Sequence, residues 1–493
     1  MNMRTMKIKS IILISTLLLA TSVSAKKYVG YSGKNHANVN PVSGKTGAFD
    51  CTPSSSQIDI NINNIRARIL GGGDFWWDGV ETAKYEVPKV DPASGVTPVS
   101  SLFTGALWFT GLDNGGNLKC ASQTYRNQGH DFYTGPLSGL YGDVNFDVCK
   151  TYDEHFEVFA SEISTLISLY NAAGGNDIPS ADIPENVLKW PGKGNPYYLE
   201  NETDKYYNEG SLAPFFDVDG NNIYDPRKGD YPIIGVKDEF GVIQPTYADQ
   251  MIFWVINDNG QIHGRTGGAV IGVQVNCLAF AYTTANALND MTFYTFEIIK
   301  KSPNPLYETY MGIFVDPDLG DATDDYIGCD TVRDIGYVYN ANAIDGQYGP
   351  NPPITAIDFF EGPLDDNGNQ LGLSSFVYFN NTTGPQSDPD VAAEFRNYQT
   401  GRWADGVQLC LPVQLMVQVR LQIMFIPVIR QILLKCLKYL AVTLLRIDVL
   451  YKTQSFYFTT GDPQRITIGV LTVFPDNYVN NFDRDVVYNI LMI

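Results

Sequence analysis

The sequence predicts a mainly β, multidomain protein whose sheets form an antiparallel β-sandwich or jelly roll, with one helical connector segment. The chain has 493 residues, enough for two or three domains of about 150 residues each. Its 30 Tyr, 26 Phe and 45 Gly favour strands and turns over long helices. Residues 250–339 contain five strand-like runs that are separated by Asn, Asp and Gly turns, with no helical pattern between them.

The first 25 residues have the pattern of a secretory signal peptide. Arg4, Lys7 and Lys9 precede an apolar run over 11–20, and a small-residue cleavage site ends at Ala25. The apolar core is shorter than the ~20 residues that span a bilayer, so we expect cleavage and no integral membrane segment. Removal of these three basic residues changes the formal charge from -20 to -23, which argues against nucleic acid as a partner.

Residues 26–150 are predicted to form an N-terminal β-rich region. The run over 58–70 alternates in polarity, and turn clusters such as "GGGDFWWDG" follow it. Trp76, Trp77 and Trp108 allow two interpretations: a platform on which sugar rings stack, or core residues, which are the more common outcome in a β-rich protein.

Residues 151–235 are predicted to hold a helix, a connector and an acidic loop. Apolar residues recur every three or four positions over 153–171, and Gly174 and Gly175 end this helix. The proline-marked stretch 178–196 follows as a connector near a domain boundary. Residues 236–406 then form the β-sandwich domain.

The cysteines are consistent with disulfides rather than with zinc. Of the seven cysteines, two lie in the unusual segment 407–453 discussed below, and the other five, Cys51, Cys120, Cys149, Cys277 and Cys329, are scattered singly, without any CxxC pair. Export permits disulfides, and a Cys120 to Cys149 bridge is plausible. Spacing alone leaves the connectivity open, and an odd set of five leaves at least one thiol free.

The stretch "FFDVDGNNIYDPRKGDYP" predicts a calcium-binding loop. Its oxygen-bearing side chains lie at relative positions one, three, five and nine, with one further acid as a late ligand: Asp217, Asp219, Asn221, Asp225 and Asp230. Calcium takes six to eight oxygen ligands, and the spacing matches the first part of an EF-hand loop. The match breaks at Asn222, where EF-hands have Gly, and at Lys228, where they have Glu. The alternative is an Asx-rich turn bonded to its own backbone.

A second acidic loop, "FVDPDLGDATDDYIGCD", holds six aspartates and no Lys or Arg: Asp316, Asp318, Asp321, Asp324, Asp325 and Asp330. A bound cation would relieve their mutual repulsion, so we predict a second structural calcium site. The alternatives are a carboxylate pair that acts as acid and base, as in glycosidases, and a solvated acidic turn. The four histidines, His36, His130, His155 and His263, fit no catalytic motif, so no catalytic residue is assigned.

The same loops carry a family resemblance. Together with "FWVINDN", "FYTFEIIKKSPNPLYETYMGI" and "GRWADG", they resemble a largely uncharacterised group of large secreted Bacteroidetes proteins that usually end in a type IX secretion C-terminal sorting domain. The resemblance covers residues 75–406 and implies an exported or cell-surface protein that uses the type IX export machinery. It implies no reaction. No sorting-domain pattern is recognised before Ile493, and without one the expected location is the periplasm.

Residues 407–453 differ from the rest of the mature chain. They contain 25 Leu, Ile, Val or Met among 47 residues. A membrane hairpin is one interpretation, but basic residues interrupt every span of bilayer length. The alternative is a frameshift, because Val-Gln codons at 407, 413 and 417 give turn-forming residues when they are read one base earlier. We therefore predict two compensating frame changes, near Gly406 and Gln454, with residual strands and an apparent truncation over 454–493.

These observations predict an exported or surface protein with structural calcium loops and a role in adhesion or binding, its partner being an extracellular glycan or a surface molecule. The alternative is a carbohydrate-active enzyme or carbohydrate-binding module that uses the tryptophans and some of the same carboxylates.

Overall fold

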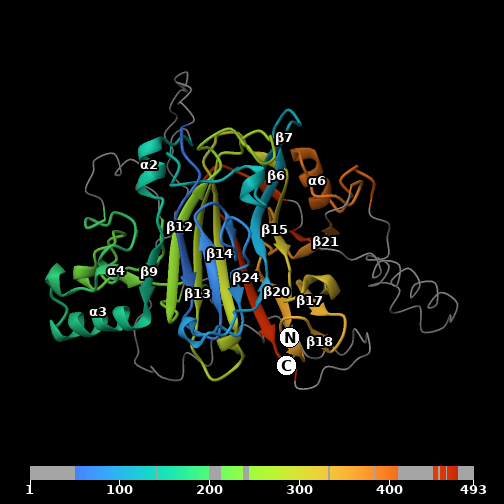
Figure 1. Cartoon of the computed structure of the whole chain (residues 1–493). Helices are drawn as coiled ribbons and strands as arrows, with labels where there is room; N and C mark the ends of the chain where they lie inside the picture. Colours follow the sequence, from blue (N-terminus) through green and yellow to red (C-terminus); the bar gives the residue numbers. More distant parts are fainter. Residues whose placement is uncertain are drawn as a thin grey trace.

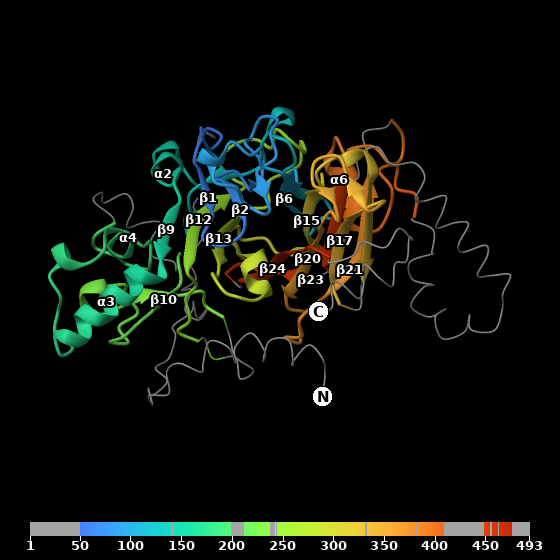
Figure 2. The ribbon, with the colours of Figure 1, turned by 60° about the horizontal axis from the view of Figure 1, so that its bottom comes forward.

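A computed structural model describes residues 50–139, 142–198, 212–236, 242, 244–330, 333–380, 383–408, 448–453, 456–461 and 463–475, the stretch 448–453 by its backbone alone. The prediction of a mainly β, antiparallel fold is confirmed: these residues form two large sheets and two two-stranded ones. Figures 1 and 2 show the two large sheets at the centre, with α3 and α4 at one end of the molecule and α6 at the other.

The first large sheet has eleven strands, all paired antiparallel. Its main path is β21 (Leu373–Phe379), β22 (Asp448–Thr453), β15 (Leu306–Asp316), β6 (Thr104–Leu112), β3 (Asp74–Phe75), β2 (Arg66–Leu70), β4 (Tyr85–Glu86) and β5 (Ser100–Leu102). Three further strands pair with this path: β1 (Gln57–Ile60), β7 (Leu118–Ser122) and β23 (Phe456–Phe458).

The second large sheet has nine strands, also antiparallel. Its path is β16 (Asp325–Asp330), β17 (Ile335–Asn340), β20 (Ile354–Glu361), β24 (Gln464–Val473), β14 (Met291–Lys300), β13 (Val273–Ala281), β12 (Gln250–Asn257) and β8 (Tyr133–Thr134). The strand β9 (Phe156–Phe159) pairs with β12 beside β8. The two small sheets are β10 (Phe215–Phe216) with β11 (Tyr231–Pro232), and β18 (Ile344–Asp345) with β19 (Gly349–Pro350).

One hydrophobic core lies between the two large sheets, so the body of the protein is a β-sandwich. Strand β12 shows the pattern, because Ile252 and Trp254 join this core while Met251 and Phe253 join a second core on the other face. Across the first core, the Trp76 Nε1–H donates to the Tyr294 hydroxyl at 2.9 Å. The outer faces of these strands are also apolar, so other elements must pack against them.

Helices and loops provide these outer covers. On the nine-stranded sheet, α3 (Ala160–Ala172) and α4 (Glu185–Leu188) contribute to the second core. On the eleven-stranded sheet, α6 (Ala392–Gln399) places Phe395 against Trp108, with ring centroids 4.5 Å apart. The short α2 (Phe146–Thr151) follows β8. No helix among the described residues is both long enough and apolar enough to span a membrane.

Two local predictions are wrong. The expected helix over 153–171 begins only at Ala160, because Phe156 and Val158 point into the second core from strand β9. The side chain of Glu162 accepts the backbone N–H of Phe159 and so starts the helix there. Cys149 pairs with Cys51 rather than with Cys120, which is a buried free thiol.

The large sheets draw their strands from distant parts of the chain. Strands from the regions predicted as 26–150 and 236–406 share both sheets and one core, so the described strands do not separate at residues 150 and 235. Strand β24, from the region 454–493, lies between β20 and β14 near the middle of its sheet. The signal peptide and residues 409–447 of the apolar segment lie outside the described residues, whereas 448–453 form β22.

Candidate metal centre

The first acidic loop connects β10 to β11, which pair antiparallel and bring the two ends of the loop together. Asp217 follows β10 directly, and Asp230 precedes β11 directly. Pairing of the strands therefore places two carboxylates that are thirteen positions apart in the sequence beside each other. Gly229 has φ +89° and packs under the ring of Tyr170, which anchors the loop to α3.

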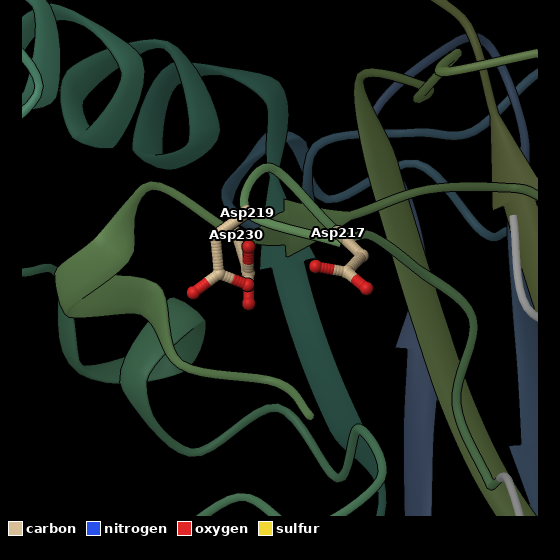
Figure 3. A group of neighbouring side chains, drawn as sticks. All are labelled: Asp217, Asp219 and Asp230. Carbon is tan, nitrogen blue, oxygen red and sulfur yellow. The ribbon is translucent and has the colours of Figure 1, made fainter. Parts of the chain in front are cut away.

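Three carboxylates of this loop converge. Asp217, Asp219 and Asp230 each offer an oxygen, and these oxygens all lie within 4.8 Å of one another (Figure 3). No other trio of acidic, His or Cys side chains in the described part of the chain approaches so closely. Asp230 is fully buried, Asp217 is nearly so, and Asp219 faces solvent.

The loop backbone holds these carboxylates in place. Asp230 accepts the N–H of Val218 through Oδ1 and that of Asp225 through Oδ2, both at 2.8 Å. Asp217 accepts the N–H groups of Gly220 and Asn222, both at 2.7 Å. These bonds orient the side chains. Asp217 Oδ1 also accepts the N–H of Asn221 at 3.3 Å, whereas Asp217 Oδ2 and both oxygens of Asp230 accept one backbone N–H each and have a second lone pair that can face a cation.

The electrostatics of the site favour a cation. Burial raises the pKa of Asp230 to about 7, and the charges of Asp217 and Asp219 add to this effect against two backbone hydrogen bonds. Burial also raises the pKa of Asp219, but its hydrogen bonds with Lys228 and Asn221 outweigh this and the net shift is downward. Lys228 forms an ion pair with Asp219 at 3.1 Å, on the exposed side of the loop. A divalent ion would neutralise the buried carboxylates.

The other two predicted ligands of this loop, Asn221 and Asp225, accept hydrogen bonds from backbone N–H groups. The Asn221 side-chain oxygen accepts the N–H of Ile223 at 2.7 Å. Asp225 caps a short 3₁₀ turn, Pro226–Lys228, by accepting the N–H of Arg227 at 3.1 Å. Neither residue belongs to the converging trio.

The structure also reveals a turn motif that the sequence analysis did not recognise. Asp-x-x-Gly-Asn occurs at 113–117, 217–221 and 365–369, with Gly116, Gly220 and Gly368 at φ +75°, +74° and +78°. In the first and third copies the aspartate binds the following backbone N–H groups and the Asn side chain. The turn bonds of Asp217 are thus expected with or without a metal. What sets the second copy apart is the presence of Asp219 and Asp230.

The second acidic loop leads from β15 to β16 and distributes its aspartates differently. Asp316 accepts the Tyr125 hydroxyl at 2.7 Å, and Asp330 accepts Arg333 at 2.6 Å. Asp330 lies five strand positions beyond Asp325, or about 16 Å along β16, so it is not brought to the loop.

The remaining four aspartates of this loop lie nearer to one another. Asp321 caps the 3₁₀ turn Ala322–Asp324, and Asp324 accepts the Asn342 side-chain N–H at 2.8 Å. Asp325 is acted on by the charges of Asp318, Asp324 and Asp345. Asp345, from β18, is a member that the sequence did not predict, because it is separated from the loop by strand β17.

The tryptophans are core residues. Trp76, Trp77 and Trp108 are each exposed by at most 1 %. The Trp77 indole N–H donates to Asp74 at 2.8 Å, and that of Trp108 donates to the Gln123 carbonyl at 2.7 Å. None of the three presents a ring face to solvent for sugar stacking.

Comparison with protein-family models finds no match, and neither does comparison with curated proteins. The resemblance to secreted Bacteroidetes proteins therefore stays a prediction.

Proposed function

We propose that this chain is an exported or cell-surface β-sandwich protein with an adhesive or binding role, and that calcium stabilises it structurally. The observation that supports the calcium part is the convergence of Asp217, Asp219 and Asp230 within 4.8 Å. Burying carboxylates without a counter-charge costs several kcal/mol, and a hard divalent ion with oxygen ligands removes that cost. Calcium, which is available outside the cell, would then stabilise the folded form of the β10–β11 hairpin.

The test is calorimetric titration of calcium into the full chain, with a matched pair of variants. Asp217→Asn removes a charge from the trio, and we expect it to lose one bound calcium and the associated rise in melting temperature. Asp113→Asn makes the same change in the same Asp-x-x-Gly-Asn turn, where no other carboxylate joins the aspartate, and should bind as the wild type does. Equal behaviour of the two variants, or no heat with the wild type, would refute calcium binding at this loop.

The adhesive or binding role rests on the predicted signal peptide and on the family resemblance. Its test is location: antibody labelling of intact cells distinguishes a surface protein from a periplasmic one. The alternative, a carbohydrate-active enzyme or carbohydrate-binding module, depended on Trp76, Trp77 and Trp108 as a surface on which sugar rings stack. All three side chains are buried, so they do not form that surface. We therefore do not adopt this alternative.

A further inference from the structure

The second acidic loop contains a buried carboxylate oxygen without a hydrogen-bond partner. Asp325 opens β16 and is 8 % exposed. Its Oδ2 accepts the N–H of Leu319 at 2.8 Å, so the carboxyl group points into the loop. Its Oδ1 is inaccessible to solvent and accepts no hydrogen bond. Leaving such an atom unsatisfied costs about 1–3 kcal/mol, and more when the group is charged, so its place needs an explanation.

The strongest charges around this oxygen are all negative. Burial raises the pKa of Asp325 to about 9, and Asp318, Asp324 and Asp345 add to the rise. Burial also raises the pKa of Asp324, again with Asp345 among its causes. Arg333 is the first basic residue after Lys301 in the sequence, and it pairs with Asp330 at the far end of β16. Hydrogen bonds from Leu319 and Asn342 partly offset these effects, but every charge that acts on Asp324 and Asp325 here is negative.

Asp345 joins the loop from a separate segment. Its Oδ2 accepts the N–H of Asp321 at 2.9 Å, and its Oδ1 accepts that of Gln347 at 2.8 Å. Gly320 has φ +71°, and a Cβ on it would lie 2.3 Å from Asp345 Oδ1. The segment 320–321 and Asp345 are thus in direct contact.

We propose that Asp325 Oδ1 is a ligand of a hard divalent cation that is bound between the loop 318–325 and Asp345. Carboxylates and backbone carbonyls are the ligands that calcium prefers, and an ion here would satisfy the buried oxygen and offset four negative charges at once. This inference shares the ion class with the proposed function but uses none of the residues of the first loop. Because β15 belongs to one large sheet and β16 to the other, the ion would stabilise the loop that crosses between the two sheets of the sandwich.

The experiment is calcium calorimetry on the full chain with four variants. We expect two equivalents of calcium for the wild type, one for Asp325→Asn, one for Asp217→Asn and none for the double variant. Asp330→Asn is the matched control, since Asp330 lies on the same strand with Arg333 as its partner, and it should keep both equivalents.

The competing explanation for the buried oxygen is a proton. Asn imitates a protonated Asp in shape and charge, so under that explanation Asp325→Asn binds as many equivalents of calcium as the wild type and keeps its melting temperature, and the inference is overturned. Loss of calcium in Asp217→Asn but not in Asp325→Asn would also overturn it while leaving the first site intact. Loss in Asp325→Asn alone would support it and refute the first site.

Should Asp325→Asn fail to fold, Asp324→Asn replaces it, because that side chain is only partly buried. We expect the calcium affinity of the second loop to fall at least tenfold in this variant. Unchanged affinities at both sites would contradict the inference.

Discussion

The two acidic loops have similar compositions but different places in the fold. The loop 217–230 closes a hairpin in an outer layer and collects its three carboxylates from one short segment. The loop 316–330 crosses from one large sheet to the other and gains Asp345 from beyond the next strand. In the first loop, each of Asp217 and Asp230 accepts backbone hydrogen bonds through both oxygens, whereas in the second an oxygen of Asp325 is buried without one.

Because of these different positions, we expect the first ion to affect the stability of one hairpin and the second ion to affect the stability of the whole β-sandwich. An ion in the first loop would order the hairpin β10–β11 and its contact with α3, and losing it would leave the sandwich intact. An ion in the second loop would act where the sheets are joined, so losing it should lower the stability of the whole body. Segments with few contacts to the core open at lower free energy than the core itself.

The largest expected effect comes from a pair of glycine substitutions, one in each loop. Gly220 and Gly320 have nearly the same φ, +74° and +71°, but a Cβ on Gly220 meets open space while one on Gly320 would collide with Asp345. We expect Gly220→Ala to cost about 1 kcal/mol, the penalty for Ala in the left-handed region. Gly320→Ala should cost about 2–4 kcal/mol, because overpacking also displaces Asp345 from its backbone bonds.

Urea unfolding in calcium-free buffer measures both substitutions. Equal costs would mean that the loop 318–325 and Asp345 are not in contact, and the comparison between the loops would then fail.

The architecture follows from sequence patterns where strands are long and locally paired. The five runs in 250–339 became β12, β13, β14, β15 and β17, because each alternates or is continuously apolar between Asn and Asp turns, whereas β16 was hidden in the acidic loop. The pairing of β24 between β14 and β20 was not predictable, since it depends on contacts between residues more than 100 positions apart. Phe156 to Phe159 shows the same limit: its helical spacing was overridden by tertiary pairing with β12.

The candidate sites divide in the same way. Proximity within one loop was enough to place Asp217, Asp219 and Asp230 among the five predicted ligands, because a hairpin brings its own ends together. It did not separate them from Asn221 and Asp225, which accept backbone hydrogen bonds. Asp345 carries no signal in the sequence near the second loop, and Asp316 and Asp330 could not be separated from Asp325 without the partners Tyr125 and Arg333. Six aspartates in a run do not say which of them face inward.

Acid unfolding would test both loops at once, but His155 contributes to it and has to be subtracted. Its ring lies 5.7 Å from Trp254, its Nε2 is buried without a partner, and burial lowers its pKa to about 3. The folded state therefore favours the neutral ring. Its contribution is constant above the unfolded pKa of about 6.5, and stability falls as the pH drops from there towards 3.

The expected loss from His155 alone is about 2 kcal/mol at pH 5. His155→Phe cannot take up a proton, so its stability curve between pH 6.5 and 4.5, measured by urea unfolding in chelator, should be flatter than that of the wild type by this amount. Parallel curves would show that the ring is protonated within the folded protein.

The smallest expected effect comes from substituting Lys228, which should change calcium affinity at the first loop and leave the second loop unaffected. Its ammonium donates to Asp219 at 3.1 Å, and both side chains are over 30 % exposed, so the pair itself contributes little stability. It does place a positive charge beside the trio, where at about 6 Å it repels a divalent ion by roughly 1 kcal/mol. Lys228→Gln should therefore raise calcium affinity at the first loop about three- to tenfold and leave the second loop unchanged. Lys189→Gln, in an exposed pair with Glu185, is the control and should change neither. A fall in affinity in Lys228→Gln would instead show that Lys228 positions Asp219 for the ion. The ion pair on the exposed side of this loop would then help to form the site, and its positive charge would not oppose calcium binding.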